Sequence, residues 1–370
     1  MKDRLGNHIQ QVRGVSYKPN DLSETLSDGY TTLLRANNIC EGKINFDNVQ
    51  FVRSNKVSPE QILKTNDILV CSSSGSLSLV GKSALYKKTG EHTFGAFCKV
   101  VRATGKLLPQ YIAFYMCSQA YRRHIENIAN GANINNLRNE HLDEILLPIL
   151  PESRQNAIIA KLEKVQSVIS YRQTQLAKLD ELVKCRFVEM FIGKGYPRRE
   201  LQSLIQDGTS ISYGIVQPGD DGTGNIGLLR PVDFHNGSVV LDNLKYIGEA
   251  ISNLSRKSIL EGNELLITVR GTTGLTALTN SNHRGMNVTR GIAVVKYDGR
   301  KIVPEYLQAF MSSDESQTYI REHTRGATLQ QINLSDLRIQ SILVPPFVEQ
   351  QTFADFVSLI DKLRFFVGRV

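Results

Sequence analysis

The chain has 370 residues, which is long for one domain and ordinary for two. Hydrophobic residues make up 41% and charged residues 22%, a globular composition that argues against disorder. No run reaches the ~20 apolar residues of a membrane helix, and the polar N-terminus has no apolar core, so we expect no membrane span and no signal peptide. The five cysteines have neither CxxC nor Cys/His spacing. This pattern is typical of reduced thiols in a cytoplasmic protein and predicts no metal site.

The formal net charge of +8 is unevenly distributed along the chain. Residues 1–150 carry 18 Lys and Arg against 13 Asp and Glu, and residues 151–196 carry 8 against 5. Residues 197–370 balance at 18 against 18, yet residues 256–301 within them hold 8 against 3. Basic stretches in an otherwise balanced chain suit a polyanionic partner. A mildly basic surface without such a partner accounts for the charge equally well.

An internal repeat organises the chain. The segment LLRANNICEGKINFDNVQFV at residues 33–52 aligns with LLRPVDFHNGSVVLDNLKYI at 228–247, an offset of 195. The same offset relates NGANINNLRNEHLDEILLPILPESRQ at 130–155 to RGATLQQINLSDLRIQSILVPPFVEQ at 325–350. This period is far too long for a solenoid and indicates a duplicated domain. A duplicated domain binds a partner with two similar halves, and duplex DNA is the commonest such partner.

A long helix is predicted between the two copies. Residues 152–192 contain neither Gly nor Pro, and their apolar residues recur in alternating steps of four and three. That 3.5-residue stripe is typical of a coiled-coil seam. At ~1.5 Å per residue the helix is about 60 Å long, so we expect it to separate the two globular parts. A long core helix inside one larger domain is the alternative.

Each copy is predicted to mix helices and strands. The alternating, β-branched runs at 44–52 and 239–247 indicate strands, as do the short apolar runs NDILV and NELLIT. In each copy a proline opens one amphipathic helix with 3.6-residue periodicity, beginning near Pro109 and Pro304. The predicted fold class is therefore α/β (α+β), with a strongly twisted, partly antiparallel mixed sheet in each copy.

We find no catalytic constellation in the sequence. Glu41-Gly-Lys43, with Asp28 upstream, has the residue types of a nuclease-type carboxylate site. Its repeat counterpart, Asn236-Gly-Ser238, has neither the carboxylate nor the lysine. Glycine after Glu or Asn between two alternating runs is typical of a hairpin turn, and we favour that interpretation.

Three segments carry a resemblance to a known family. They are RGATLQQINLSDLRIQSILVPPFVEQQTFADFVSLIDKL, its degenerate copy NGANINNLRNEHLDEILLPILPESRQNAIIAKLEKVQSVI, and QTQLAKLDELVKCRFVEMF between them. The first two resemble the signature block of the specificity subunits of type I restriction-modification systems. The third resembles the central conserved helix of that family. The resemblance covers the whole chain.

The resemblance implies a division of the chain into four parts. The family has two similar target-recognition domains, joined by long conserved helices that form an antiparallel coiled coil. The expected parts are a first target-recognition domain at 1–150, a central helix acting as spacer at 151–195, a second target-recognition domain at 196–346, and a shortened distal helix at 347–370. Because that helix ends at Val370, we expect an incomplete second docking surface for a partner subunit.

The resemblance also implies the function and the partners. Each domain reads one half of a bipartite, asymmetric DNA site, and the chain is not itself an enzyme and holds no cofactor. Two modification subunits supply S-adenosylmethionine-dependent adenine methylation, and a restriction subunit adds ATP- and Mg-dependent translocation and cleavage. The expected partners are therefore double-stranded DNA, typically two modification subunits, and the restriction/translocase subunit. The alternative function is a self-sufficient DNA methyltransferase or nuclease with an atypical active site.

Candidate DNA contacts are polar and basic side chains on loops between strands, where they reach base edges, and arginines on or after helices, where they reach phosphates. Many of them lie at matched places in the two copies. The candidate base-reading residues are Ser72, Ser73, Ser74, Ser76, Lys82, Asn133, Asn135, Asn136, Arg270, Thr272, Thr273, Arg284, Asn287, Arg290, Thr328, Gln330 and Gln331. The candidate phosphate contacts are Arg122, Arg123, Arg321 and Arg325.

Overall fold

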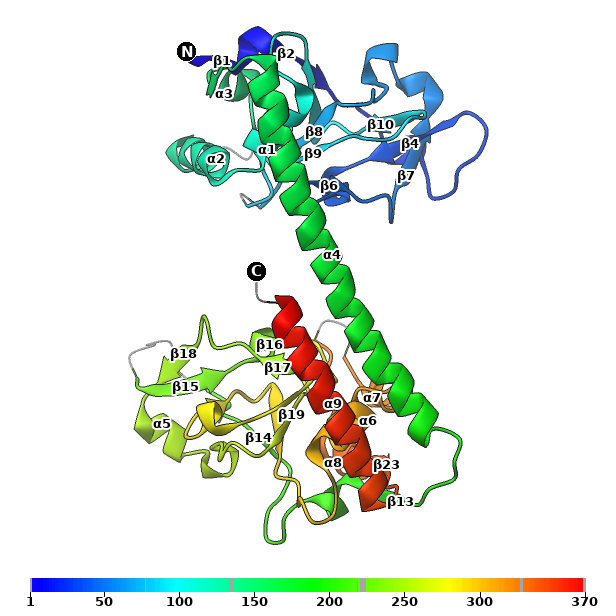
Figure 1. Cartoon of the computed structure of the whole chain (residues 1–370), viewed down its shortest axis with the longest axis vertical. Helices are drawn as coiled ribbons and strands as arrows, with labels where there is room; N and C mark the ends of the chain where they lie inside the picture. Colours follow the sequence, from blue (N-terminus) through cyan, green and yellow to red (C-terminus); the bar gives the residue numbers. More distant parts are fainter. Residues whose placement is uncertain are drawn as a thin grey trace. The chain divides into compact units, whose positions relative to one another are not determined.

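The computed structural model describes residues 2–76, 78–132, 136–217, 219, 224–326 and 329–368 (Figure 1). The chain divides into two compact units, Met1–Ser170 and Tyr171–Val370. One copy of the repeat lies in each unit, and the division falls inside the helix α4 (Glu152–Phe191).

The first unit contains two four-stranded sheets. One is antiparallel, in the order β2–β11–β8–β9. The other has the order β10–β4–β7–β3 and is mixed, because β10 and β4 pair in parallel. Two further pairs are antiparallel, β1 with β12 and β5 with β6. The strands are β1 (Lys2–Arg4), β2 (Ile9–Arg13), β3 (Leu22–Ser23), β4 (Tyr30–Leu34), β5 (Ile39–Cys40), β6 (Lys43–Ile44), β7 (Gln50–Arg53), β8 (Ile68–Cys71), β9 (Ser83–Leu85), β10 (His92–Phe94), β11 (Cys98–Ala103) and β12 (Leu146–Pro148).

The second unit repeats this arrangement. Its antiparallel sheet has the order β14–β22–β19–β20, and its mixed sheet has the order β18–β15–β21 with β15 and β21 parallel. The pairs β13–β23 and β16–β17 correspond to β1–β12 and β5–β6. The strands are β13 (Arg198–Glu200), β14 (Ser212–Tyr213), β15 (Ile226–Leu229), β16 (Phe234–His235), β17 (Ser238–Val239), β18 (Lys245–Ile247), β19 (Leu265–Thr268), β20 (Thr276–Leu278), β21 (Asn287–Val288), β22 (Ile292–Val295) and β23 (Ser341–Leu343). The mixed helix-and-sheet fold class and the duplication predicted from the sequence are confirmed.

The amphipathic helix predicted in each copy is two helices. In the first unit the hydroxyl oxygen of Ser118 accepts a hydrogen bond from the Tyr121 N–H at 3.3 Å, and in the second Ser313 accepts one from Ser316 at 3.4 Å. Serine at this position starts a new helix, because its side chain satisfies an N–H that the first turn leaves unpaired. The helices other than α4 are α1 (Pro109–Met116), α2 (Gln119–Ala132), α3 (Asn139–Asp143), α5 (Glu249–Asn253), α6 (Pro304–Met311), α7 (Asp314–His323), α8 (Leu334–Arg338) and α9 (Phe347–Gly368).

The hairpin interpretation of the Glu-Gly and Asn-Gly pairs is confirmed. Glu41 and Gly42 have φ angles of 49° and 75° between β5 and β6, and Asn236 and Gly237 have 47° and 77° between β16 and β17. Two successive positive φ angles define the type I′ turn of a two-residue hairpin. The strand predicted at 44–52 is instead interrupted, because Asn48 has a φ of 54°.

The central antiparallel sheet of each unit is buried on both faces. In the first unit one face packs against α1 through Ile112 and Met116. In the second unit the corresponding face packs against α6 and also against the end of α4, where Phe187 and Phe191 are buried. The core of the second unit therefore includes the last turns of the long helix.

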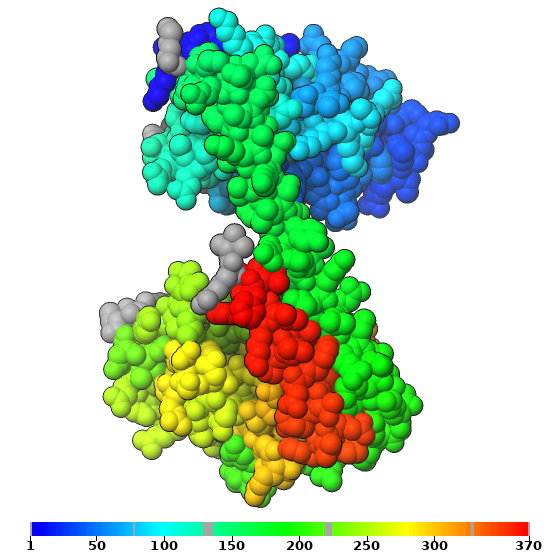
Figure 2. Space-filling view, viewed as in Figure 1, coloured from blue at the N-terminus to red at the C-terminus, as the bar shows by residue number. Residues whose placement is uncertain are grey.

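The helix α9 runs antiparallel to the last part of α4 within the second unit. In Figure 2 the surface of α9, coloured red, lies against that part of α4, coloured green. Phe353 near the start of α9 lies 5.7 Å from the ring of Phe187, and Arg364 near its end pairs with Asp180 at 2.6 Å. The predicted antiparallel packing of the conserved helices is therefore present in this unit. No helix in the described part of the chain is both long and apolar enough to cross a bilayer.

Candidate nucleic-acid interface

Two loops that are far apart in the sequence meet at one end of the central sheet in the first unit. Ser73, which follows β8, forms an antiparallel bridge with Asn136, which lies in the signature block. Beside this bridge the Leu137 N–H donates to the Ser72 carbonyl at 2.7 Å. We call this meeting of the two loops the junction.

The second unit has the same junction with different side chains. Arg270, which follows β19, forms an antiparallel bridge with Gln331. Next to it the Gly271 N–H donates to the Gln330 carbonyl at 2.9 Å, and the Ile332 N–H donates to the Val269 carbonyl at 3.0 Å. Each unit thus brings together two of the loops singled out in the sequence, and main-chain hydrogen bonds hold them.

Several cationic side chains of the second unit lie at or near its junction. Arg325 forms a second bridge with Gln331, and its side chain is 74% exposed although it lies 3.8 Å from Asp336. Arg290 is exposed in the loop before Gly291, whose carbonyl accepts from the Val269 N–H at 2.8 Å. These arginines would face a polyanion that approached this end of the sheet. The loop after β19 also carries Thr272, which is exposed, and Thr273, which is half-buried. Arg321 is exposed on α7.

Two of the predicted residues are not part of this group. Asn287 is completely buried, where its amide nitrogen donates to the Ser252 hydroxyl at 3.0 Å and its amide oxygen accepts from the Ser258 hydroxyl at 2.7 Å. A buried amide with satisfied hydrogen bonds offers none to a base, so we correct the interpretation of Asn287 to a framework role. Arg284 is exposed, and its Nε donates a hydrogen bond to the Glu261 carbonyl. Because Glu261 precedes β19 and Arg270 follows it, the two arginines lie at opposite ends of that strand.

The loop between β8 and β9, residues 72–82, carries four of the candidate serines, and we call it the serine loop. It is anchored at both its ends. The N–H groups of Ser72 and Ser73 donate to the Phe97 carbonyl at 2.8 and 3.1 Å. Farther along, Arg122 of α2 donates to the Val80 carbonyl at 2.8 Å and pairs with Glu126. The guanidinium predicted to contact phosphate therefore also ties the loop to α2. Ser74 is half-buried, and Ser76, Lys82, Arg123 and Asn136 are exposed. Asn133, Asn135 and Thr328 lie outside the described residues.

A cavity of about 420 Å³ lies beside the serine loop. Its lining includes Ser73 and Ser74 together with Tyr17, Arg35 and Phe97, which the sequence analysis did not single out. The repeat offered a signal for Arg35, because the offset of 195 residues pairs it with Arg230. The structure pairs Phe97 with Gly291, since their carbonyls accept from the N–H groups of Ser72 and Val269 at matching places of the two sheets.

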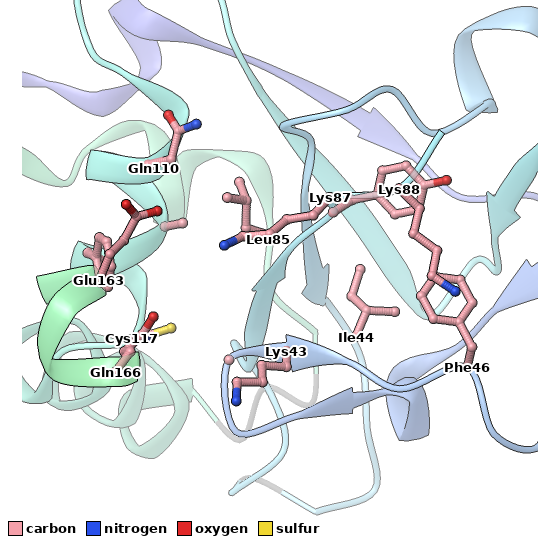
Figure 3. Close-up of a pocket in the computed structure, with 14 residues that line it drawn as sticks. Lys43, Ile44, Phe46, Leu85, Lys87, Lys88, Gln110, Cys117, Glu163 and Gln166 are labelled. Carbon is pink, nitrogen blue, oxygen red and sulfur yellow. The ribbon is translucent and has the colours of Figure 1, made fainter. Parts of the chain in front are cut away.

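A second cavity of the first unit, about 320 Å³, lies between α4 and the β5–β6 hairpin (Figure 3). Lys43 and Lys88 line one side of it, and Glu163 and Gln166 of α4 line another. Ala113 lines this cavity at the position where the second unit has Gln308, whose amide donates to the hairpin carbonyl of Gly237 at 2.7 Å.

The first unit also has a buried lysine, Lys99, in its central sheet. Lys99 on β11 donates to the Gln11 side chain at 3.0 Å and to the Asn139 side chain at 2.8 Å. Burial lowers the pKa of Lys99 to about 8. Among the described residues there is no group of three or more His, Cys, Asp and Glu that could hold a metal ion.

Comparison with known proteins shows which family the chain resembles. A family model described as the type I restriction modification DNA specificity domain matches residues 221–365. The chain is 27% identical to the EcoKI specificity subunit of Escherichia coli K12 and 28% identical to the StySPI specificity subunit of Salmonella potsdam. Both alignments cover 95% of this chain and 79% of the relative. The chain is therefore similar over almost its whole length to the specificity subunits of type I restriction-modification systems.

The fold agrees with this similarity. A solved chain from a study of complex assembly and conformational transition in a type I restriction-modification system aligns with 100% of this chain and 92% of its own length. The TM-score is 0.53 at 16% sequence identity, so the likeness shows a shared fold. The residues matched by the family model include the complete junction of the second unit.

Proposed function

We propose that this chain is the DNA-reading subunit of a type I restriction-modification complex and that each unit reads one half of a bipartite, asymmetric site. The observation that carries the proposal is the junction. In both units the same main-chain arrangement presents different side chains, Ser73 and Asn136 in one and Arg270 and Gln331 in the other. A shared frame with different hydrogen-bonding groups is what two readers of unlike half-sites require.

We further propose that the chemistry belongs to partner subunits. Two modification subunits would methylate adenine with S-adenosylmethionine, and a restriction subunit would use ATP and Mg²⁺, while this chain supplies recognition alone. The exposed apolar residues of the long helices offer docking surfaces for such partners. On α4 these include Leu162, Val165 and Ile169, and on α9 they include Leu359 and Phe366. No observation favours the alternative of a self-sufficient methyltransferase or nuclease.

The first test is co-expression of the chain with a modification subunit of its own system, followed by sequencing of methylated adenines. We expect one two-part motif with a fixed gap. Exchange of residues 197–346 for those of a relative should change one half of the motif and leave the other intact. A simultaneous change of both halves would contradict two independent readers.

A second test addresses the absence of chemistry in this chain. The isolated chain is irradiated with labelled S-adenosylmethionine and, separately, incubated with DNA and Mg²⁺. We expect neither labelling nor cleavage. Labelling of the isolated chain would support the methyltransferase alternative, and cleavage would support the nuclease.

A further inference from the structure

Arg35 and Arg230 occupy equivalent places in the two units. Each lies just before a short 3-10 helix, where its N–H donates to the side chain three residues on, Asn38 at 2.9 Å and Asp233 at 2.7 Å. Each also donates from Nη2 to a main-chain carbonyl, at 3.2 Å for Arg35 and 2.8 Å for Arg230. The two guanidinium groups therefore start from the same framework.

The two arginines differ in what neutralises them. The Asp233 carboxylate accepts from Nε of Arg230 at 3.1 Å and from its Nη2 at 2.7 Å. In the first unit the acid is replaced by Asn38, whose amide nitrogen donates to the carbonyls of Asn45 and Asp47 instead. The Nε of Arg35 is buried and has no hydrogen-bond partner within the described part of the chain. Within the described residues Arg35 therefore lacks the carboxylate that neutralises its counterpart, and its guanidinium keeps a charge that faces the cavity it lines.

The surroundings of the two arginines differ as well. In the second unit Pro231 packs so closely on Gly291 that a Cβ added there would lie 2.9 Å from the proline ring. The first unit has Ala36 and Phe97 at these positions, and Phe97 is 66% exposed. The smaller alanine and the outward phenylalanine leave the 420 Å³ cavity, which Arg35 lines together with Ser73 of the junction.

We infer that this cavity is a DNA-contact site of the first unit alone, in which Arg35 donates to the acceptor atoms of a base edge and Phe97 packs against an adjacent base. The inference rests on the proposed function. The guanidinium fork matches the two acceptors of guanine in the major groove, and phenylalanine contacts the thymine methyl group there. The second unit has an arginine at its junction too, but from another position, since Arg270 replaces Ser73. Each unit therefore has an arginine near its junction, but Arg35 follows β4 in the first unit and Arg270 follows β19 in the second.

The test uses two duplexes, the one that the wild-type chain selects from a random library and a scrambled duplex of equal length. Arg35→Ala should weaken binding to the selected duplex by roughly 5- to 150-fold and leave binding to the scrambled duplex near wild type. Arg35→Lys should not restore the loss, because an ammonium lacks the planar fork. Phe97→Gly, which installs the residue of the second unit, should relax the preference at a neighbouring base pair of the same half-site.

Two further variants keep the test decisive. Asn38→Asp recreates the Arg230–Asp233 pair, so it should reproduce the loss while Arg35 and the cavity stay in place. Arg53→Ala is the matched control, because Arg53 is an exposed arginine of the same unit that lies over the Tyr30 ring and does not line the cavity. It should leave selected-site binding near wild type. Thermal unfolding of every variant establishes that the unit is folded.

Each contrary outcome has a separate meaning. Equal losses on both duplexes for Arg35→Ala, with rescue by lysine and a salt slope lowered by about one, would make Arg35 a phosphate contact and overturn the base-reading inference. Wild-type affinities for folded Arg35→Ala and Phe97→Gly would remove the cavity from the interface. A wild-type chain that selects no sequence would overturn the proposed function itself, and the inference with it.

Discussion

Gln155 and Gln350 make two equivalent hydrogen bonds in the two units. The Gln155 side-chain oxygen accepts from the Leu108 N–H at 2.8 Å, and its amide donates to the Leu150 carbonyl at 2.9 Å. Gln350 accepts from Val303 at 2.9 Å and donates to Pro345 at 2.8 Å. Both glutamines are buried on long helices, and each accepts from the N–H of the residue just before α1 or α6. Each long helix is thereby fixed to its globular part.

Replacement of Gln350 by alanine should therefore destabilise the second unit by about 1–3 kcal/mol, because a buried N–H and a carbonyl lose their partner. Gln350→Glu should recover only part of the loss, since a carboxylate accepts but does not donate. Chemical denaturation measures both, with exposed Gln173→Ala on α4 as the control. Equal stability of Gln350→Ala and wild type would show that water replaces the side chain.

The buried Lys99 predicts a pH dependence of stability. Its pKa is lowered by burial to about 8 in the folded chain, against 10.5 when unfolded. Between these values the unfolded chain binds more protons, so this group makes the free energy of unfolding rise with pH, by up to about 1.4 kcal/mol per pH unit. Below pH 8 both states are protonated and the slope from Lys99 vanishes.

Denaturation of wild type and Lys99→Met from pH 7 to pH 10 checks this prediction. The difference between their unfolding free energies should be constant below about pH 8 and change above it in the direction that favours wild type. The comparison with the variant removes the contributions of tyrosines and cysteines that titrate in the same range. A constant difference up to pH 10 would mean that Lys99 keeps an ordinary pKa.

The cavity in Figure 3 should close when the residue of the second unit is installed. Ala113→Gln places an amide where Gln308 donates to the Gly237 carbonyl, and the equivalent acceptor is Gly42. We expect the variant to be more stable by about 0.5–1.5 kcal/mol, the usual net value of one hydrogen bond. Ala113→Glu is the control of similar size that has no donor. A lower melting temperature for the glutamine variant would show that Cys117, which also lines the cavity, leaves too little room.

The two candidate arginines of the second unit should separate in a binding experiment. Arg270 lies at the junction and Arg284 at the other end of β19. Arg270→Ala should cost about 1–3 kcal/mol on the selected duplex, whereas Arg284→Ala should bind near wild type. Fluorescence anisotropy on selected and scrambled duplexes measures both. Equal losses for the two variants would place DNA along the whole length of the strand rather than at one end.

Much of the architecture was accessible from the sequence because the duplication gives each element an independent second sample. The long helix, the hairpin turns and the buried strands after Asn66 and Asn263 depend on local periodicity and turn chemistry, which the chain displays directly. The helix breaks at Ser118 and Ser313 were missed, because a serine inside an amphipathic pattern is equally compatible with a continuous helix.

The candidate site was only partly predictable, because it depends on which loops meet. The sequence predicted correctly that polar residues lie in loops. The burial of Asn287, however, follows from the packing of α5 beside β21, which no local sequence pattern reveals. Arg284 lies at the far end of β19 from Arg270 because of the direction in which that strand runs. Arg35 was overlooked because its neutral neighbour Asn38 gains meaning only when it is compared with Asp233 in the second unit.

The main-chain character of the junction has a consequence for how recognition diversifies. Its loops are held by backbone N–H and carbonyl groups, which every residue except proline supplies. Side chains at Ser73, Asn136, Arg270 and Gln331 are thus relieved of structural duty, and exchange there carries little folding penalty. Under the proposed function, a lineage of such proteins would acquire new DNA targets through a few substitutions in one copy, while the other copy preserved half of the ancestral site.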